Sequence, residues 1–217
     1  MLVYSGDEIY DYSLDLSISP KYPHEPWPSQ SVRYGSGAFW NNGFLICGGM
    51  RAQGAYNGTN HCYHRQLGGS EESLTSMVTN RTFLRMVIAG GRPWVTGGAG
   101  GNFGDLIVFK TTEILDHNNE WELGPDLPLE LFSHCLCPVQ VGKQDVFLLH
   151  GGSTFGWDRS ARIWLFHWPS QSWSALPNMT NAITNHACAP FTAKDGINMV
   201  ITAGGSTMNG IVSKVIK

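Results

Sequence analysis

The stretch "GFLICGGM", residues 43–50, runs a short apolar segment directly into two adjacent glycines. The same arrangement returns in "PWVTGGAG" (93–100), "VFLLHGGS" (146–153) and "MVITAGGS" (199–206), so the glycine pairs lie 49, 54 and 53 residues apart. The segments before the glycines are rich in β-branched and aromatic residues, which favour strands. Self-similarity at a period of about 50 residues predicts a repeat protein built from short strands. The pairs are Gly48 and Gly49, Gly97 and Gly98, Gly151 and Gly152, and Gly204 and Gly205.

A tryptophan recurs at a fixed offset in the second and third repeats. Trp121 follows Ile114 by seven residues and Trp173 follows Phe166 by seven, with a polar stretch between the two aromatic or aliphatic positions. This spacing predicts a strand, a turn and a further strand that begins near a large aromatic side chain. The first repeat has no tryptophan in the corresponding stretch "ESLTSMVTNR" (72–81), so the fourth strand is less clearly marked there.

The glycine pairs and the spaced tryptophans resemble those of the kelch repeat family. The resemblance extends over residues 31–217 and implies four repeats, at 31–80, 81–130, 131–180 and 181–217. It implies an all-β fold in which each repeat is a four-stranded antiparallel blade and the blades stack radially into a β-propeller. The glycine pairs would then mark the centre, where backbones approach closely and a positive φ allows a sharp exit, and Trp121 and Trp173 would fill the space between blades.

Two arrangements are open for the ring that this resemblance implies. Kelch propellers usually have more than four blades, which favours a part of a longer propeller. Alternatively, residues 1–30, which we interpret as a late strand of a preceding or closing blade followed by a proline-rich loop, complete the last blade of a four-bladed ring.

Charge and composition argue against several classes of partner. Asp, Glu, Lys and Arg make up 14% of the 217 residues and the formal net charge is −3, whereas a typical domain has about 25% charged residues. Without a basic stripe or helix, the chain is not expected to bind nucleic acid or an anionic membrane surface. No apolar segment reaches the roughly 20 residues of a membrane span. The start lacks the features of an export signal, which slightly favours a cytoplasmic location, while a secreted one stays open if the sequence continues before Met1.

Five cysteines leave the redox compartment open. Cys47 and Cys62 fall on strands expected to be neighbours in the first blade, so they form either a cross-strand disulfide or two independent buried thiols. A disulfide would indicate an oxidising compartment. Cys135 and Cys137 share one face of a strand, are poor partners for each other and are expected to be small core residues.

No metal, cofactor or catalytic residue is predicted from the sequence. The cluster "NHCYH" (60–64) contains a cysteine and two histidines, but no partner cluster with zinc spacing accompanies it. His134 and His186 lie 17 and 18 residues before their glycine pairs. Equivalent repeat positions favour a structural hydrogen bond for both histidines, with a ligand role as the alternative.

The segments that follow the glycine pairs are expected to be loops that gather on one face of the propeller, where a rigid scaffold commonly carries its binding specificity. Aromatic and arginine side chains are typical of binding hot spots. The candidates in these loops are Arg51, Tyr56, Phe155, Trp157 and Arg159. We therefore expect a non-enzymatic scaffold that binds a protein partner through this face.

Two other functions remain open. A galactose oxidase-like copper enzyme would need two tyrosines, one of them cross-linked to a cysteine, and two histidines, and the neighbouring Cys62, Tyr63 and His64 are the residues that suggest it. A secreted carbohydrate-binding module would agree with the aromatic richness and the low charge of the chain.

Overall fold

The structure is a computed structural model, and it describes residues 2–5, 8–12, 18–20, 33–50, 58–67, 69, 71–101, 105–141, 144–193, 198–208 and 210–211. Throughout these residues the chain is all-β, as predicted, with one 3-10 turn, η1 (Phe155–Trp157). Arg51 and Tyr56, two of the predicted binding residues, lie outside the described ranges.

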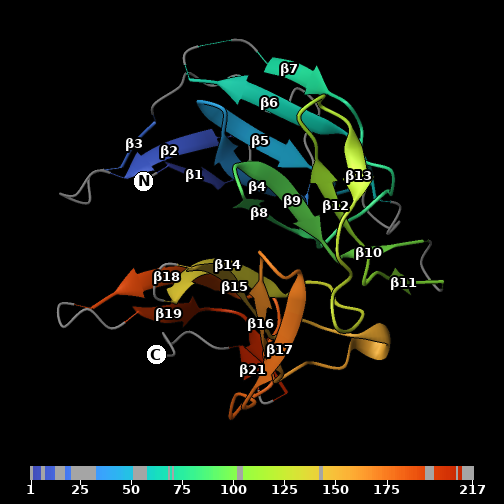
Figure 1. The fold of residues 1–217 in the computed structure, drawn as a ribbon, viewed down its shortest axis with the longest axis vertical. Helices are drawn as coiled ribbons and strands as arrows, with labels where there is room; N and C mark the ends of the chain where they lie inside the picture. Colours follow the sequence, from blue (N-terminus) through green and yellow to red (C-terminus); the bar gives the residue numbers. More distant parts are fainter. Residues whose placement is uncertain are drawn as a thin grey trace.

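Three four-stranded antiparallel sheets form the body of the molecule (Figure 1). Sheet 1 contains β4 (Ser36–Trp40), β5 (Gly43–Cys47), β6 (Cys62–Gln66) and β7 (Glu71–Leu74). Sheet 2 contains β8 (Arg85–Ala89), β9 (Arg92–Thr96), β12 (Thr112–Leu115) and β13 (Trp121–Leu123). Sheet 3 contains β14 (Cys135–Val141), β15 (Gln144–His150), β16 (Ile163–His167) and β17 (Ser172–Leu176). The strands of each sheet lie side by side in chain order, which confirms four-stranded antiparallel units for these three repeats.

Smaller sheets complete the described chain. β18 (Ala187–Thr192) and β19 (Asn198–Ala203) pair with each other, and β1 (Leu2–Ser5), β2 (Glu8–Tyr12) and β3 (Ile18–Pro20) form a three-stranded sheet. Two short hairpins follow the second and fourth glycine pairs: β10 (Ala99–Gly100) with β11 (Ile107–Val108), and β20 (Ser206–Thr207) with β21 (Gly210–Ile211). The turn η1 occupies the corresponding place after the third pair.

Each glycine pair bends the chain sharply at the end of a second strand. All eight glycines have φ between 54° and 96°, a region that is open to glycine and costly for residues with a Cβ atom. The second glycine of a pair lies against the entry to its own unit: a Cβ on Gly98 would be 2.7 Å from the Thr82 carbonyl oxygen. The first lies against the entry to the next unit: a Cβ on Gly48 would be 2.7 Å from the Arg81 carbonyl oxygen. Both positions therefore exclude a side chain.

The units are joined by a repeated backbone contact. The first strands touch in the order β4, β8, β14 and β18. The residue two positions before each of these strands has a φ between 52° and 61°. Its N–H donates to the carbonyl of the equivalent residue in the preceding unit: Phe83 to Tyr34 (2.8 Å), Ser133 to Phe83 (2.9 Å) and Asn185 to Ser133 (3.2 Å). These hydrogen bonds set the spacing between neighbouring sheets.

The hydrophobic core lies between the sheets. Trp94 on β9 is fully buried, and its ring lies 5.5 Å from that of Phe147 and 4.9 Å from that of Phe166, both in sheet 3. A second cluster contains Leu45 and Met77 from the first unit together with Trp121 from the second. Because large apolar side chains from two sheets meet in each cluster, hydrophobic burial holds consecutive sheets together.

The two tryptophans singled out in the sequence make matching contacts. The indole N–H of Trp121 donates to the Thr75 carbonyl at 2.9 Å, and that of Trp173 donates to the Asp126 carbonyl at 2.9 Å. In both cases the acceptor belongs to the preceding unit. Each tryptophan therefore packs its ring and satisfies its polar edge across the junction between two units.

A buried ion pair also fastens sheet 2 to the segment that leads into it. Arg81 and Glu113 are fully buried, with Nη2 of the arginine 2.9 Å from Oε1 of the glutamate. Arg81 also donates to the carbonyl and the hydroxyl of Thr111. Glu113 accepts the backbone N–H groups of Val78 and Thr79. Because both charged groups are extensively hydrogen-bonded, the pair can exist without water.

Candidate functional site

The segments that follow the glycine pairs lie together at one end of the sheets. Because neighbouring strands are antiparallel, each second strand ends where the first strand of its unit begins. The hairpins β10–β11 and β20–β21 and the turn η1 therefore lie at the same end as the residues that precede the first strands. β10, β11 and η1 are seen at the right of Figure 1. We call this end, which carries the four glycine pairs, the glycine-pair face.

A row of aromatic side chains crosses the glycine-pair face over three units. The ring centroids of Tyr34 and Phe83 are 4.5 Å apart, those of Phe83 and Phe132 5.8 Å, and those of Phe132 and Trp157 5.1 Å. Tyr34 and Trp157 are 54% and 48% exposed, whereas Phe132 is buried. Each ring rests on the next, so the row offers apolar surface that loses little conformational freedom on binding.

Three members of this aromatic row have an unusual backbone conformation. Tyr34, Phe83 and Trp157 have φ values of 61°, 56° and 67°. A positive φ is costly for bulky residues, and such residues concentrate at binding sites and switches. At Tyr34 and Phe83 this conformation accompanies the main-chain hydrogen bonds between units. At all three residues it sets the direction in which the side chain leaves the backbone.

A hollow lies beside the row on the glycine-pair face. It has a volume of about 450 Å³ and is lined by Lys110, Leu129, Glu130, Thr154 and Phe155. Phe155 is 68% exposed. The hollow thus combines an exposed ring with one positive and one negative side chain, a mixture that can contact both apolar and polar groups of a partner.

Arg159 connects the loop of the third unit to that of the fourth. Its Nη2 donates to the Ser206 hydroxyl at 2.8 Å, and its Nη1 lies 3.2 Å from the Met208 sulfur. Met208 is 75% exposed. Arg159 therefore positions two loops relative to each other in addition to presenting a charged group at the surface.

The structure brings together the three predicted loop residues that it describes, Phe155, Trp157 and Arg159. Sequence reasoning missed the rest of the aromatic row: Tyr34, Phe83 and Phe132. A signal was available, because Tyr34 and Phe83 are 49 residues apart and each lies two residues before a first strand. The third and fourth units have serine and asparagine at that place, which hid the pattern.

Three histidines are almost wholly buried beneath the glycine-pair face. His134 Nε2 lies 2.9 Å from the Thr96 hydroxyl, and His186 Nε2 lies 3.2 Å from His150 Nδ1. Thr96 and His150 each directly precede a glycine pair, and His134 and His186 each lead into the next unit. The structural hydrogen bonds predicted for His134 and His186 are therefore present.

Burial keeps these imidazoles neutral. It lowers the pKa of His134 to about 3 and that of His150 to about 4, with a further contribution from the positive charge of Arg85. Burial, together with His150 and Arg85, lowers the pKa of His186 to about 3. Each neutral ring has one donor and one acceptor nitrogen. His134 Nδ1, His150 Nε2 and His186 Nδ1 have no hydrogen-bond partner among the described residues.

Two disulfides are present in the described part of the chain. Cys47 and Cys62 are directly opposed on β5 and β6, with Cα atoms 4.1 Å apart, so the alternative left open by the sequence resolves in favour of a bridge. Cys135 and Cys188 join β14 to β18 across the junction between units, with Cα atoms 6.1 Å apart. Cys135 is buried as expected, but its bridge was missed because Cys188 lies 53 residues away. Cys137 is a free buried thiol whose pKa burial raises to about 12.

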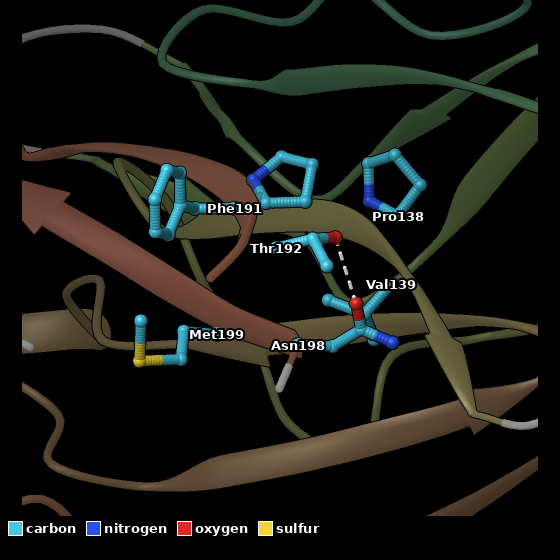
Figure 2. A pocket seen from close by; sticks show the side chains of 7 residues that line it. Pro138, Val139, Phe191, Thr192, Asn198 and Met199 are labelled. Carbon is cyan, nitrogen blue, oxygen red and sulfur yellow. Dashed lines mark hydrogen bonds between the residues drawn. The ribbon is translucent and has the colours of Figure 1, made fainter. Parts of the chain in front are cut away.

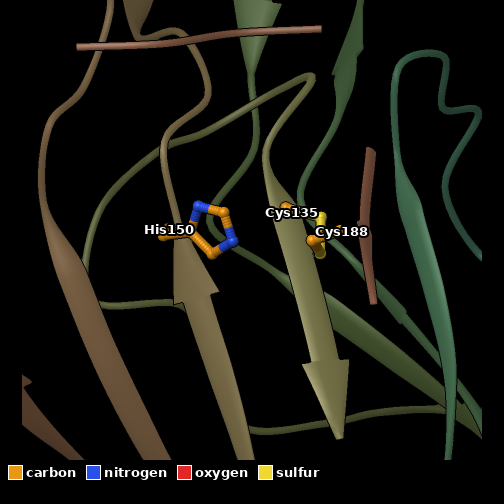
Figure 3. Close-up of side chains that lie close together, drawn as sticks. All are labelled: Cys135, His150 and Cys188. Carbon is orange, nitrogen blue, oxygen red and sulfur yellow. A yellow bond between two sulfur atoms is a disulfide. The ribbon is translucent and has the colours of Figure 1, made fainter. Parts of the chain in front are cut away.

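His150 lies against the second disulfide (Figure 3). Its ring and the sulfur atoms of Cys135 and Cys188 offer three metal-binding atoms within 4.8 Å of one another. Arg85 Nη2 lies 3.3 Å from the Cys135 sulfur. The three donor residues come from β14, β15 and β18, so their proximity depends on the packing of two units.

The residues that suggested a copper enzyme lie inside sheet 1. Tyr63 and His64 are 7% and 2% exposed, and His64 Nε2 lies 3.0 Å from the Trp40 carbonyl oxygen. The Cys62 sulfur is bonded to Cys47. A cross-link to a tyrosine would need that sulfur as a free thiol, so the bridge competes with it.

A second hollow opens at the opposite end of the sheets, between β14 and the β18–β19 pair (Figure 2). It has a volume of about 280 Å³, and Thr192 and Asn198 form a hydrogen bond of 2.8 Å at its edge. Its lining is mostly apolar: Pro138, Val139, Pro190, Phe191, Thr192, Asn198 and Met199. It lies away from the aromatic row.

The fold is similar to that of YjhT, whose solved structure matches with a TM-score of 0.73. The match covers 92% of this chain and 67% of that chain, at 15% sequence identity. Similarity at this identity shows a shared fold alone. No protein-family model and no curated protein matches the chain. Within the described ranges, no helix has the length and apolar character needed to cross a membrane.

Proposed function

We propose that the chain is a kelch-type β-propeller, whole or partial, and that it binds a protein partner through the glycine-pair face. The observation that carries the binding proposal is the exposed aromatic row, in which Tyr34 and Trp157 are 54% and 48% exposed. Tyrosine and tryptophan are enriched at protein interfaces because a ring buries a large area and carries a polar edge.

The propeller proposal is supported by the repeated joints between units. Glycine pairs with positive φ, matching tryptophan contacts to the preceding unit and first strands that touch in chain order are features of radially stacked sheets. A crystal structure tests it: β4, β8, β14 and β18 should surround a common axis. Four first strands in a flat row would contradict the propeller.

The binding proposal is tested by photo-cross-linking. Phe155 is 68% exposed, so a benzoylphenylalanine in its place should cross-link the partner. Mass spectrometry then identifies the cross-linked protein, and calorimetry measures its affinity after purification. We expect Phe155→Ala and Trp157→Ala each to weaken binding by about 2 kcal/mol or more, because buried aromatic anchors dominate interface energies. Both variants should retain stability to within about 1 kcal/mol, because the two side chains are largely exposed.

The matched control is Phe39→Ala. Phe39 is 50% exposed, but it lies on β4 next to the β4–β5 turn, at the end of sheet 1 away from the glycine pairs. This variant should bind the partner with unchanged affinity. If all three variants bind the partner as tightly as the unaltered chain, Phe155 and Trp157 do not belong to the interface.

A secreted carbohydrate-binding module is the second candidate. It is favoured by the two disulfides, which are typical of oxidising compartments, and by exposed rings on which a sugar can stack. Asn80 and Asn178, each in an Asn-X-Thr triplet, are exposed. A glycan array probed with the purified chain separates the two candidates: binding that Trp157→Ala abolishes would favour the carbohydrate module over the protein scaffold.

A further inference from the structure

The side chains of Cys135, His150 and Cys188 form a cluster with the composition of a zinc site. Their donor atoms lie within 4.8 Å of one another, and Cys135 and His150 are buried. Two thiolates and one imidazole are ligands that zinc prefers, with Zn–S distances of about 2.3 Å and Zn–N distances of about 2.0 Å. Tetrahedral coordination at these bond lengths separates the donors by about 3.6–3.8 Å. The imidazole nitrogen is thus within about 1 Å of the separation from the sulfurs that zinc requires. The two sulfurs are bonded to each other in this structure and have to move apart once that bond is reduced.

A second observation, an unsatisfied nitrogen of His150, concerns the same cluster. His150 is 2% exposed, and its Nε2 atom has no hydrogen-bond partner among the described residues. Figure 3 shows its ring beside the Cys135 and Cys188 sulfurs. A buried polar atom without a partner is costly, and native proteins normally satisfy it. A metal ion between this nitrogen and the two sulfurs would satisfy it.

The other nitrogen of His150 has the partner that a metal-binding imidazole needs. Nδ1 lies 3.2 Å from His186 Nε2. If Nδ1–H donates to that nitrogen, Nε2 keeps its lone pair toward the sulfurs. Metal-bound histidines usually donate their second ring N–H to a hydrogen-bond acceptor, which fixes the tautomer and the ring orientation. Arg85, whose Nη2 is 3.3 Å from the Cys135 sulfur, can hydrogen-bond a thiolate there.

We propose that Cys135, Cys188 and His150 bind a zinc ion when the two cysteines are reduced, and that the disulfide is the metal-free, oxidised form of the same site. This proposal does not depend on the binding function proposed above. The Cys47–Cys62 bridge lies within one sheet. Among the described residues, its sulfurs form no such cluster with a histidine.

A dithiol reductant can convert the disulfide form into the zinc-binding form in a reaction whose atoms and electrons balance. The dithiol closes its own disulfide and transfers two electrons and two protons, so the Cys135–Cys188 bond breaks and two thiols form. Zinc then replaces the two thiol protons, which pass to solvent, and forms two Zn–S bonds and one Zn–N bond. Oxidation by a disulfide-bonded oxidant reverses the electron transfer and releases the ion.

The test uses the full chain and zinc itself. One sample is left oxidised, and the other is reduced under argon with a phosphine, which takes its oxygen from water and leaves both protons on the sulfurs. After dialysis against zinc, elemental analysis should find a single bound ion per reduced chain and none on the oxidised chain. Cobalt(II) in place of zinc should give a thiolate-to-cobalt charge-transfer band only in the reduced sample.

Variants identify the ligands. His150→Gln and the double variant Cys135→Ser/Cys188→Ser should each weaken zinc binding by at least about 100-fold, because losing a ligand costs more than losing its hydrogen-bond partner. The matched control, Cys47→Ser/Cys62→Ser, removes the other bridge and should bind zinc like the unaltered chain. Circular dichroism of each variant checks that it is folded.

The proposal is overturned if the reduced, unaltered chain binds no zinc, a result that does not depend on how any variant folds. Zinc binding that survives in Cys135→Ser/Cys188→Ser but disappears in Cys47→Ser/Cys62→Ser would overturn it too. An unchanged affinity and cobalt spectrum in His150→Gln would exclude the histidine and with it the proposed site. None of these measurements involves a partner protein, so their failure leaves the binding proposal unaffected.

Discussion

At the scale of the residue, the two glycines of a pair serve different contacts. The second glycine makes room for the entry to its own unit, and the first makes room for the entry to the following unit. Gly48, Gly97 and Gly151 all have the next unit within contact distance of a hypothetical Cβ, whereas Gly204 has no atom within 4 Å of that position among the described residues. The four first glycines therefore share a backbone conformation but differ in what surrounds them.

This difference predicts unequal costs for the same substitution. Gly48 and Gly204 have nearly the same φ, 70° and 68°, so an alanine adds a similar backbone strain of about 1–2 kcal/mol at both. Gly48→Ala also forces Cβ to within 2.7 Å of the Arg81 carbonyl oxygen, and such overpacking adds about 1–3 kcal/mol. Urea unfolding should therefore show a larger loss of stability for Gly48→Ala. Equal losses would mean that the close approach contributes nothing.

At the scale of the element, Glu113 connects strand β12 to the segment that leads from sheet 1 into sheet 2. It holds the Arg81 guanidinium and two backbone N–H groups of that segment. Glu122, on the neighbouring strand β13, pairs with Arg92 at 3.1 Å, but its side chain is 57% exposed. Sheet 2 thus supplies the glutamate of a buried and of an exposed arginine–glutamate pair.

We expect Glu113→Gln to destabilise the protein by about 3–5 kcal/mol, because Arg81 would remain charged and buried without its counterion. Glu122→Gln, the matched control, should cost about 0–1 kcal/mol, because solvent screens the exposed pair. Free energies of unfolding from urea titrations at one pH compare the two. A similar cost for both substitutions would show that burial does not strengthen the Arg81–Glu113 contact.

The elements marked by local patterns were predictable from the sequence. The strand before each glycine pair is present as β5, β9, β15 or β19, and β13 begins at Trp121 as the spacing indicated. The kelch-type propeller itself stays a prediction. Contacts between units were harder to foresee: the Cys135–Cys188 bridge joins residues 53 apart, and its formation depends on how two sheets pack. The aromatic row was hidden because only some units carry a ring at the equivalent place.

At the scale of the whole molecule, burial is uneven along the series of units. The central strands of sheet 2 are almost completely buried, whereas the residues of β18 are mostly exposed and those of β19 mostly half-buried. In the described chain, β18 and β19 pair only with each other. When stability comes from contacts between neighbouring units, a unit with fewer contacts opens more easily.

Hydrogen exchange should reveal this difference. Backbone amides of β18 and β19 are expected to exchange at least about tenfold faster than those of β9 and β12, which corresponds to an opening free energy lower by about 1.4 kcal/mol. Mass spectrometry of peptides from the labelled, native chain measures both regions in one experiment. The buried strands of sheet 2 provide the internal reference, and uniform protection across the four strands would show that the units open together.

The hydrogen bonds that run from Asn185 to Ser133, from Ser133 to Phe83 and from Phe83 to Tyr34 use only main-chain atoms. Two aromatic rings, a hydroxyl and an amide occupy these positions, and all four residues have a similar positive φ. The hydrogen bonds between units therefore do not depend on which side chain each unit carries at this position. A substitution can exchange a phenyl ring for a hydroxyl or an amide at the surface of one unit and still keep the main-chain hydrogen bond to the neighbouring unit.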